Sequence, residues 1–322
     1  YNSGGVNSSD VEVNIKIALA QAMRKGTLTR KARNKLLADM TGEVAALVLA
    51  NNYEQTLAIS QSRRRGLGEL PAQARMMSAL DAQRLLDRHV ENLPSAAEMA
   101  ERQARGEPLT RAEIGVLLAY AKIVLVTELV ASDLPDQPHF EQDLLSYFPA
   151  RMAKTYGDEI RGHRLRREII ARTVANDVVD RGGPSFVTAL REATGRSSAD
   201  IVRAFVTVRD GFELPALYRQ VDALDNRVDG QVQLDFYLRI GRLLQSTTAW
   251  YLKNDPLDLP LDQTIGQLRT VRKVLEQKLP EMLTAAMKER LADHRRELAA
   301  AGAPEALAER LALAPVANLV PD

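Results

Sequence analysis

Residues 2–12 hold the residue types and spacing that could do chemistry, and they read Asn-Ser-Gly-Gly-Val-Asn-Ser-Ser-Asp-Val-Glu. The glycine pair, Gly4 and Gly5, allows positive φ and lets a ligand approach the backbone without meeting a Cβ. Ser9 and Glu12 have the spacing of a capping box, which predicts a helix that begins at Ser9. The first amides of a helix lack partners and carry partial positive charge, so this start would favour a carboxylate or a phosphate. The alternative is a tight turn before an ordinary helix.

The longer pattern, Asn-x-Gly-Gly-Val-x-x-Ser-x-x-Glu, resembles the segment that closes the catalytic region of amino-acid dehydrogenases of the glutamate dehydrogenase superfamily. The resemblance implies that Asn2 lies near the nicotinamide carboxamide of NAD. It implies that Gly4 and Gly5 shape the turn against cofactor and substrate. Val6 and Ser9 would line the pocket for the substrate side chain, and the Ser9 hydroxyl would donate to the γ-carboxylate of glutamate. Such a charge-assisted hydrogen bond is worth about 1.5–3 kcal/mol, which would favour glutamate over an apolar amino acid.

A second stretch narrows the resemblance to the large bacterial NAD-specific glutamate dehydrogenases. It consists of RNKLL at 33–37, MTGEV at 40–44 and LANNYEQT at 49–56. In that family a regulatory amino-terminal half and a catalytic domain precede a helical carboxy-terminal domain. The resemblance therefore implies that this chain is a piece of a longer polypeptide.

The same resemblance implies a domain organisation. Residues 1–27 would be the terminal segment of the catalytic region, and residues 28–322 would be the helical carboxy-terminal domain. Candidate sub-boundaries lie near 182–184, where two glycines precede a proline, and near 254–260, which contains two prolines.

For the whole polypeptide the resemblance implies NAD-dependent oxidation of L-glutamate to 2-oxoglutarate and ammonia, by a homo-oligomer in the cytoplasm. The chain contains no G-x-G-x-x-G motif, so NAD would be bound mainly by the remaining domains of the polypeptide. The family's substrate-binding lysines and proton-transferring aspartate would lie upstream of Tyr1. No catalytic residue is assigned in this chain, and we expect it to be inactive alone. The alternative is a non-enzymatic, all-helical protein-interaction module in which Gly4 and Gly5 form a connector and Ser9 is dispensable.

Composition excludes several classes of site and partner. The 322 residues are 45% hydrophobic and 26% charged, with a net charge of +1 and no cysteine, which excludes disulfides and thiolate metal sites. The four histidines lie far apart without metal-ligand spacing, so we predict no metal site. The near-neutral charge and 5% aromatic content give no reason to expect nucleic acid. We predict that the arginines in 63–65 and 164–167 are solvated or ion-paired. No uninterrupted apolar run of about eighteen residues occurs, so we expect no membrane partner.

The apolar spacing is helical almost throughout, as in Val11, Ile15, Leu19 and Met23. The sequence therefore predicts an all-α fold, an irregular multi-helix bundle. Thr29 and Thr110 are predicted helix caps, the latter in a capping box with Glu113. Pro280 is expected to kink or split a helix over 261–300, because its nitrogen cannot donate a hydrogen bond.

Two consecutive amides, Asn51 and Asn52, lie within an otherwise good helix sequence. Asparagine lowers helix propensity, and such a local cost can mark hydrogen bonding to another element. The segment 51–56 is therefore a candidate tie between the helical domain and residues 2–25. The alternative is an ordinary exposed helix surface.

Overall fold

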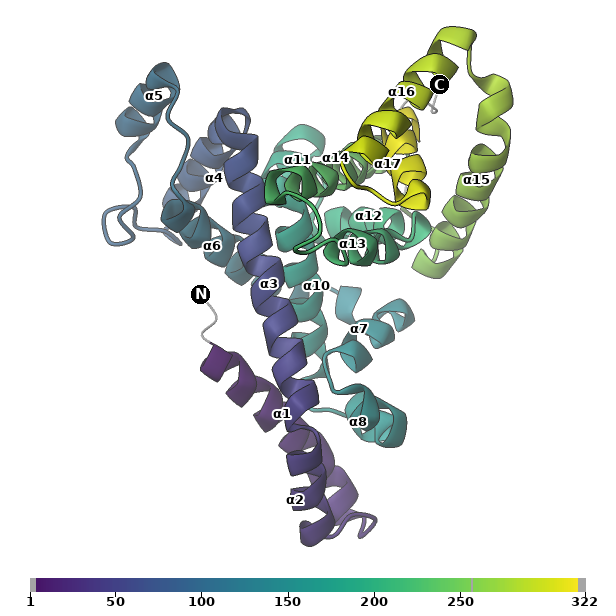
Figure 1. Cartoon of the computed structure of the whole chain (residues 1–322). Helices are drawn as coiled ribbons and strands as arrows, with labels where there is room; N and C mark the ends of the chain where they lie inside the picture. Colours follow the sequence, from purple (N-terminus) through teal and green to yellow (C-terminus); the bar gives the residue numbers. More distant parts are fainter. Residues whose placement is uncertain (1–3, 256, 318–322) are drawn as a thin grey trace. The chain divides into compact units, whose positions relative to one another are not determined.

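The computed structural model describes the backbone of residues 4–255 and 257–317, and over these residues the fold is all-α, as predicted, with no strand. The chain forms two compact units, Tyr1–Ser185 and Phe186–Asp322 (Figure 1). None of the helices in the described part is both long and apolar enough to cross a membrane.

The first unit holds ten α-helices and three short 3-10 helices within its described residues. They are α1 (Gly4–Arg24), α2 (Arg30–Asp39), α3 (Thr41–Arg65), η1 (Gly66–Gly68), α4 (Leu70–Ala82), α5 (Ala96–Arg105), α6 (Arg111–Val130), η2 (Leu134–Asp136), η3 (Pro138–Phe140), α7 (Glu141–Ser146), α8 (Ala150–Thr155), α9 (Gly157–Arg161) and α10 (Arg166–Gly182).

The second unit is built from seven α-helices over its described residues. They are α11 (Phe186–Thr194), α12 (Ser198–Gly211), α13 (Leu214–Asp222), α14 (Gly230–Asn254), α15 (Leu261–Met282), α16 (Ala285–Ala300) and α17 (Glu305–Ala317). The helix predicted over 261–300 is split, but α15 continues past Pro280 and ends at Met282. Thr284 then caps α16 by accepting a hydrogen bond from the Met287 amide.

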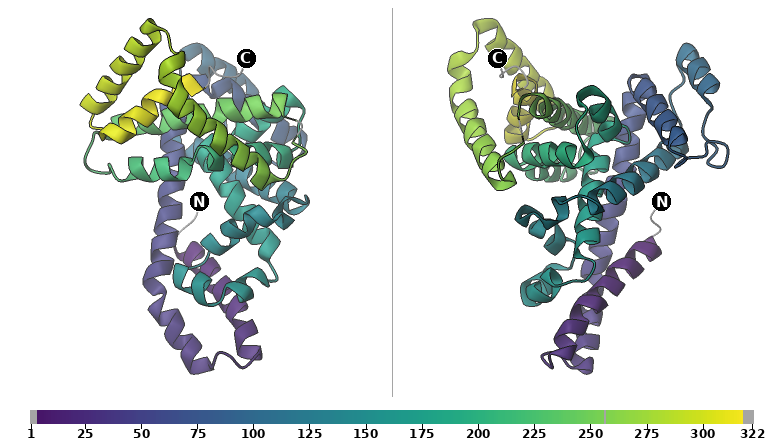
Figure 2. Two further views of the ribbon diagram at one scale, coloured as in Figure 1. Left: turned by 90° about the vertical axis from the view of Figure 1, so that its right-hand side faces the viewer. Right: turned by 180° about the vertical axis from the view of Figure 1, so that it is seen from behind.

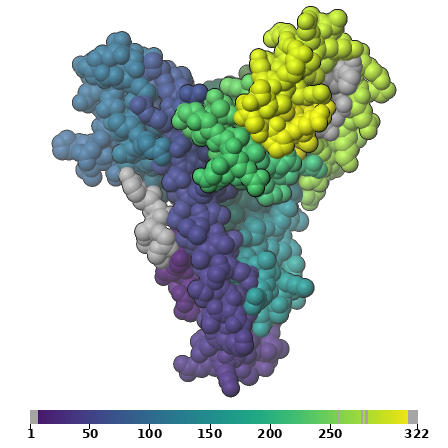
Figure 3. All heavy atoms as spheres, in the orientation of Figure 1, coloured from purple at the N-terminus to yellow at the C-terminus, as the bar shows by residue number. Residues whose placement is uncertain are grey.

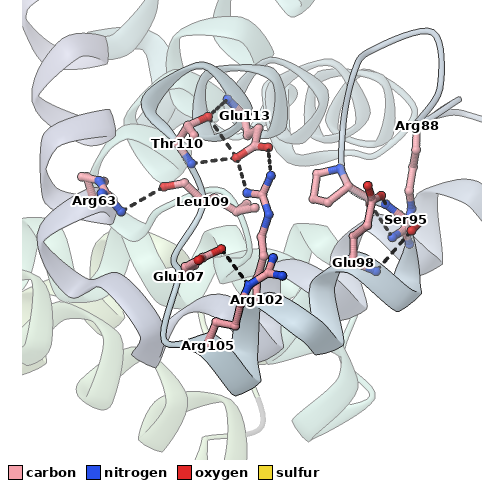
Figure 4. A network of polar contacts seen from close by, with 11 residues as sticks. Arg63, Arg88, Ser95, Glu98, Arg102, Arg105, Glu107, Leu109, Thr110 and Glu113 are labelled. Atoms are coloured by element: carbon pink, nitrogen blue, oxygen red, sulfur yellow. Dashed lines mark hydrogen bonds and ion pairs between the residues drawn. The ribbon is translucent and has the colours of Figure 1, made fainter.

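Two predicted helix caps are confirmed. The Thr29 side chain accepts a hydrogen bond from the Ala32 amide at the start of α2. Thr110 and Glu113 form the predicted capping box at the start of α6, and Arg102 of α5 also binds the Glu113 carboxylate (Figure 4). A capping box satisfies two amides that the helical ladder leaves free, so it fixes a helix start locally.

The predicted start of the first helix at Ser9 is wrong, because α1 already begins at Gly4. Ser9 lies inside the helix, and Glu12 forms an ion pair with Lys16 at 2.6 Å instead of a capping box. The extension follows from tertiary contact: Asn7 is only 4% exposed and donates a hydrogen bond to Asn51 of α3. This contact offsets the low helix propensity of the two glycines.

In the first unit α1 packs against α3 (Figures 1 and 2). α10 packs against α6, α7 and α3, so it occupies the middle of the unit. Its apolar side chains include Ile170, Val174 and Val178, all fully buried. α10 also reaches α1 directly, because Arg172 of α10 forms an ion pair with Asp10 of α1.

In the second unit α12 is central and packs against α11, α13, α14 and α15. Phe205 of α12 and Phe236 and Tyr237 of α14 are among its largest buried side chains. α16 packs on α17, which in turn contacts α14, and Figure 3 shows these two helices together at the surface of the unit.

Candidate functional site

The structure places most of the predicted site residues on one short helical segment. Asn2 lies outside the described residues. Gly4, Gly5 and Val6 lie in the first turn of α1, and Ser9 follows about one turn after Val6. Within the described residues, the amides without helical partners therefore belong to residues 4–6 and not to the region around Ser9, which corrects the expected anion position.

α1 has two different faces. Asn7, Asn14, Ile15, Ala18 and Ala22 are buried against the rest of the first unit. The opposite stripe carries side chains that reach solvent, namely Ser9, Glu12, Val13 and Lys16, and Val13 is 49% exposed. The helical period explains the division, since residues three or four apart share a face. Ser9 is thus available to groups outside this unit.

A group of polar side chains, here called the Asp10 cluster, holds the buried side of α1 at the level of Ser9. It comprises Asn7, Asp10, Asn14, Tyr147 and Arg172. The Tyr147 hydroxyl donates to Asp10 Oδ2 at 2.7 Å, and Asn14 Nδ2 donates to the Tyr147 oxygen at 2.9 Å. Arg172 forms an ion pair with Asp10, and its Nη2 lies 3.5 Å from Asn7 Oδ1. These contacts join α1 to the end of α7 and to α10.

The Asp10 cluster is suited to holding a helix and not to transferring protons. Burial, and then the hydrogen bond to Asp10, raise the pKa of Tyr147 far above its ordinary value of 10.0. The Asp10 carboxylate is engaged by both Tyr147 and Arg172. A tyrosine that stays protonated and a carboxylate with two donors form a fixed network.

His163 adds a neutral contact to the same helix. Its Nδ1 accepts a hydrogen bond from the Leu165 amide at 3.0 Å, which leaves Nε2 to donate to the Asn14 carbonyl at 3.2 Å. Burial lowers the pKa of His163 below its ordinary 6.5. The uncharged imidazole therefore links α1 to the segment that precedes α10.

The prediction that the amide segment at 51–56 bonds another element is confirmed. Asn51 accepts a hydrogen bond from Asn7 of α1 at 3.4 Å and another from Gln55 at 2.7 Å. Glu54 forms an ion pair with Arg181 of α10 at 2.7 Å. The amides therefore tie α3 to α1, and the neighbouring carboxylate ties α3 to α10.

The arginine clusters act as predicted, as partners within the fold. Arg63 donates to the Leu109 carbonyl at 3.3 Å (Figure 4), and Arg65 is paired with Glu69. Arg167 is paired with Asp136 and donates to the Ser132 carbonyl at 2.8 Å. In the part of the chain that the structure describes, no three histidine, aspartate or glutamate side chains gather as metal ligands.

Sequence reasoning missed the Asp10 cluster. Tyr147 and Arg172 lie 137 and 162 residues from Asp10 along the chain. No periodicity or short motif links positions so far apart. The local signal available was the run of polar residues at 7–10, of which the motif assigned a role to Ser9 alone.

Comparison with known families matches both parts of this architecture. The family model "Glutamate dehydrogenase, C-terminal" matches residues 106–322. The model "Bacterial NAD-glutamate dehydrogenase, catalytic domain" matches residues 1–62, which include α1 and most of α3. The chain therefore belongs to the family of glutamate dehydrogenase carboxy-terminal domains.

Three relatives are each described as NAD-specific glutamate dehydrogenase. The protein of Halomonas elongata is 43% identical over 316 residues, and that of Pseudomonas aeruginosa is 41% identical over 311 residues. The Mycobacterium tuberculosis protein is 35% identical over 310 residues. The alignments cover 96–97% of this chain but only 19% of each relative, so the chain spans about a fifth of the length of these proteins.

Proposed function

We propose that this chain is part of an NAD-dependent glutamate dehydrogenase, which oxidises L-glutamate to 2-oxoglutarate and ammonia. Its relatives carry that description and are similar over nearly the whole of this chain. The observation that carries the proposal for the site is the exposed position of Ser9 on a helix whose opposite face is anchored by the Asp10 cluster. A fixed hydroxyl that faces away from its own unit can meet a substrate held by another domain.

The Ser9 hydroxyl would donate a hydrogen bond to the γ-carboxylate of glutamate, and Val6 would contact the substrate side chain. Asn2, Gly4 and Gly5 would contact the nicotinamide end of NAD. The described residues include no strand, so they do not form the strand, turn and helix that bind a dinucleotide. This chain would therefore contact only the edge of the cofactor site.

The test is Ser9→Ala in the natural full-length protein, assayed for NADH formation with glutamate. Loss of a hydrogen bond to a charged group should raise the KM for glutamate roughly 10- to 100-fold. The KM for NAD should change less than about twofold, because the carboxylate contact concerns the substrate alone.

Ser246→Ala is the matched control, since Ser246 is also exposed in mid-helix and its hydroxyl bonds the Arg242 carbonyl of its own helix α14. It should retain the parent kinetics. Equal kinetics for Ser9→Ala and the parent would remove Ser9 from the site, and a parent without glutamate-dependent activity would refute the proposed reaction.

Asn2→Ala tests the cofactor side separately. Disturbed placement of the nicotinamide should lower kcat or raise the KM for NAD. An unchanged kcat together with an unchanged KM for NAD would contradict the role of Asn2.

We further propose that residues 1–27 act with the catalytic region and that residues 28–322 brace it within a cytoplasmic homo-oligomer. Val271 and Val274 on α15 are each 52% exposed, and such apolar side chains on one helix face support a subunit contact. Light scattering on full-length protein carrying Val271→Asp and Val274→Asp tests this point. An unchanged mass would exclude this face from the assembly.

A further inference from the structure

Arg172 connects α10 to the turn of α1 that carries Ser9. Its guanidinium forms an ion pair with Asp10, the residue next to Ser9, and its Nη2 lies 3.5 Å from Asn7 Oδ1. The Tyr147 hydroxyl engages the same Asp10 carboxylate from the end of α7, at 2.7 Å. Asp10 is thus held from two elements at once, and each of them is far from α1 in sequence.

The first turns of α1 depend on these polar contacts. Between residues 7 and 12 the single apolar side chain is Val11. The apolar part of the helix that packs into the unit, with Ile15, Ala18 and Leu19, lies one to two turns farther along. Apolar packing is non-directional, whereas an ion pair with further hydrogen bonds fixes an orientation. The Asp10 cluster therefore supplies directional contacts to the turn of α1 that carries Ser9.

Rotation matters because side-chain atoms lie away from the helix axis. With side chains an α-helix is about 10–12 Å across, so a rotation of about 20° moves a hydroxyl by roughly 2 Å. A hydrogen bond tolerates only a few tenths of an ångström around its usual length of about 2.7–2.8 Å. Misplacement by about 1 Å can cost on the order of 100-fold in rate when it affects substrate positioning.

We propose that Arg172 is a positioning residue for glutamate: by holding Asp10 it fixes the rotation of α1 and so the direction of the Ser9 hydroxyl. This inference rests on the proposed function, since it assigns the positioning of the same site. Arg172 acts through Ser9 and does not touch the substrate itself. Its influence must therefore vanish when the Ser9 hydroxyl is absent.

The experiment compares Arg172→Gln, Ser9→Ala and the double variant in the natural full-length protein. Arg172→Gln should raise the KM for glutamate about tenfold and leave the KM for NAD within about twofold. In the Ser9→Ala background the same substitution should add less than about twofold, because residues that act as a unit are non-additive. Arg172→Lys keeps the charge and should recover part of the loss.

Arg102→Gln is the matched control, because Arg102 also forms a part-buried ion pair, with Glu113, but joins α5 to α6. It should leave the KM for glutamate unchanged. Amide hydrogen exchange gives a readout without substrate: Arg172→Gln should speed exchange in residues 7–14, and Arg102→Gln should not.

Two results would overturn the inference in an active parent. One is an Arg172→Gln variant whose kinetics and exchange match those of Arg102→Gln. The other is an effect of Arg172→Gln that multiplies in full with that of Ser9→Ala. A parent without activity on glutamate would instead overturn the proposed function and the inference together, so the two failures are distinguishable.

Discussion

Lys122 of α6 and Asp180 of α10 form a buried ion pair in the first unit, with the ammonium nitrogen 2.8 Å from each carboxylate oxygen. The side chain of Asp180 is 2% exposed and that of Lys122 is 13% exposed. Burial raises the pKa of Asp180 above its ordinary 3.8, and the charge of Lys122 opposes that rise. This ion pair joins α6 to α10, and removal of either side chain leaves the other charge buried without its partner.

Lys122→Met should destabilise the protein by about 3–5 kcal/mol, because it leaves an uncompensated buried carboxylate. Urea unfolding at pH 7 measures the loss. The double variant Lys122→Met, Asp180→Leu removes both charges and should recover most of the stability, since apolar replacements of a buried pair are often neutral. A double variant as unstable as Lys122→Met would show that packing, and not the unpaired charge, causes the loss.

Glu113 should contribute stability that is lost in acid. Burial alone would raise its pKa, but hydrogen bonds from Arg102 and Thr110 outweigh burial and hold the pKa below the ordinary 4.5. A carboxyl with a lowered pKa stabilises the fold above the unfolded value, and this contribution disappears as the pH falls through the folded value. Glu113→Gln should cost about 1–2 kcal/mol at pH 7 and progressively less below pH 4.5.

Unfolding of the parent and of Glu113→Gln at pH 7 and at about pH 3 checks this dependence. Glu101→Gln is the control, because Glu101 forms an exposed pair with Arg105 on α5 and should change stability little. A difference between Glu113→Gln and the parent that is the same at both pH values would contradict an ionic role for Glu113.

Local chemistry explains which parts of the fold could be predicted. Thr29 and Thr110 with Glu113 start helices through contacts within four residues, and such contacts are visible in the spacing of residue types. Ser9 with Glu12 has the same spacing but does not start a helix, because Asn7 bonds Asn51 forty-four residues away. Tertiary contacts can override a short capping motif, and here the contact between Asn7 and Asn51 favours a helix that begins at Gly4.

The candidate site shows the same division. The motif that includes Ser9 is contiguous, so the sequence could point to it. The residues that hold it, Tyr147 and Arg172, come from two other helical regions. Ordinary polar residues at long separation carry no sequence signal until the fold brings them together. Among the residues that contact α1 from other helices, only Asn51 could be predicted from the sequence, because an asparagine within a helix lowers the helix propensity.

His163 should make stability depend on pH around neutrality. Burial lowers its pKa, so below the ordinary value of 6.5 the folded state binds fewer protons than the unfolded state; the contribution of His163 to stability is complete above that value and is lost as the pH falls below it. Urea unfolding at pH 5 and pH 8 should therefore show a larger pH difference for the parent than for His163→Gln. His89→Gln is the control, since His89 is exposed. A pH difference that His163→Gln leaves intact would assign the dependence to other groups.

Two helical glycines of the second unit should respond to alanine with opposite signs. A Cβ at Gly211 would lie 2.7 Å from Leu268 Cγ, so Gly211→Ala must push α12 and α15 apart and should cost about 1–3 kcal/mol. A Cβ at Gly241, in the middle of α14, meets no atom within 4 Å. Gly241→Ala should therefore stabilise the protein by about 0.5–1 kcal/mol through helix propensity.

Thermal and urea unfolding of the two alanine variants compare these positions directly. Leu268→Ala added to Gly211→Ala opens space for the new methyl group. In that background the cost of Gly211→Ala should shrink, because the clash is with the Leu268 side chain. If Gly211→Ala lowers the free energy of unfolding by the same amount with and without the Leu268 side chain, the backbone of α12 and not that side chain is what excludes the new methyl group. In that case the close approach of the α12 and α15 backbones, and not the contact between Leu268 and Gly211, would limit the packing of these two helices.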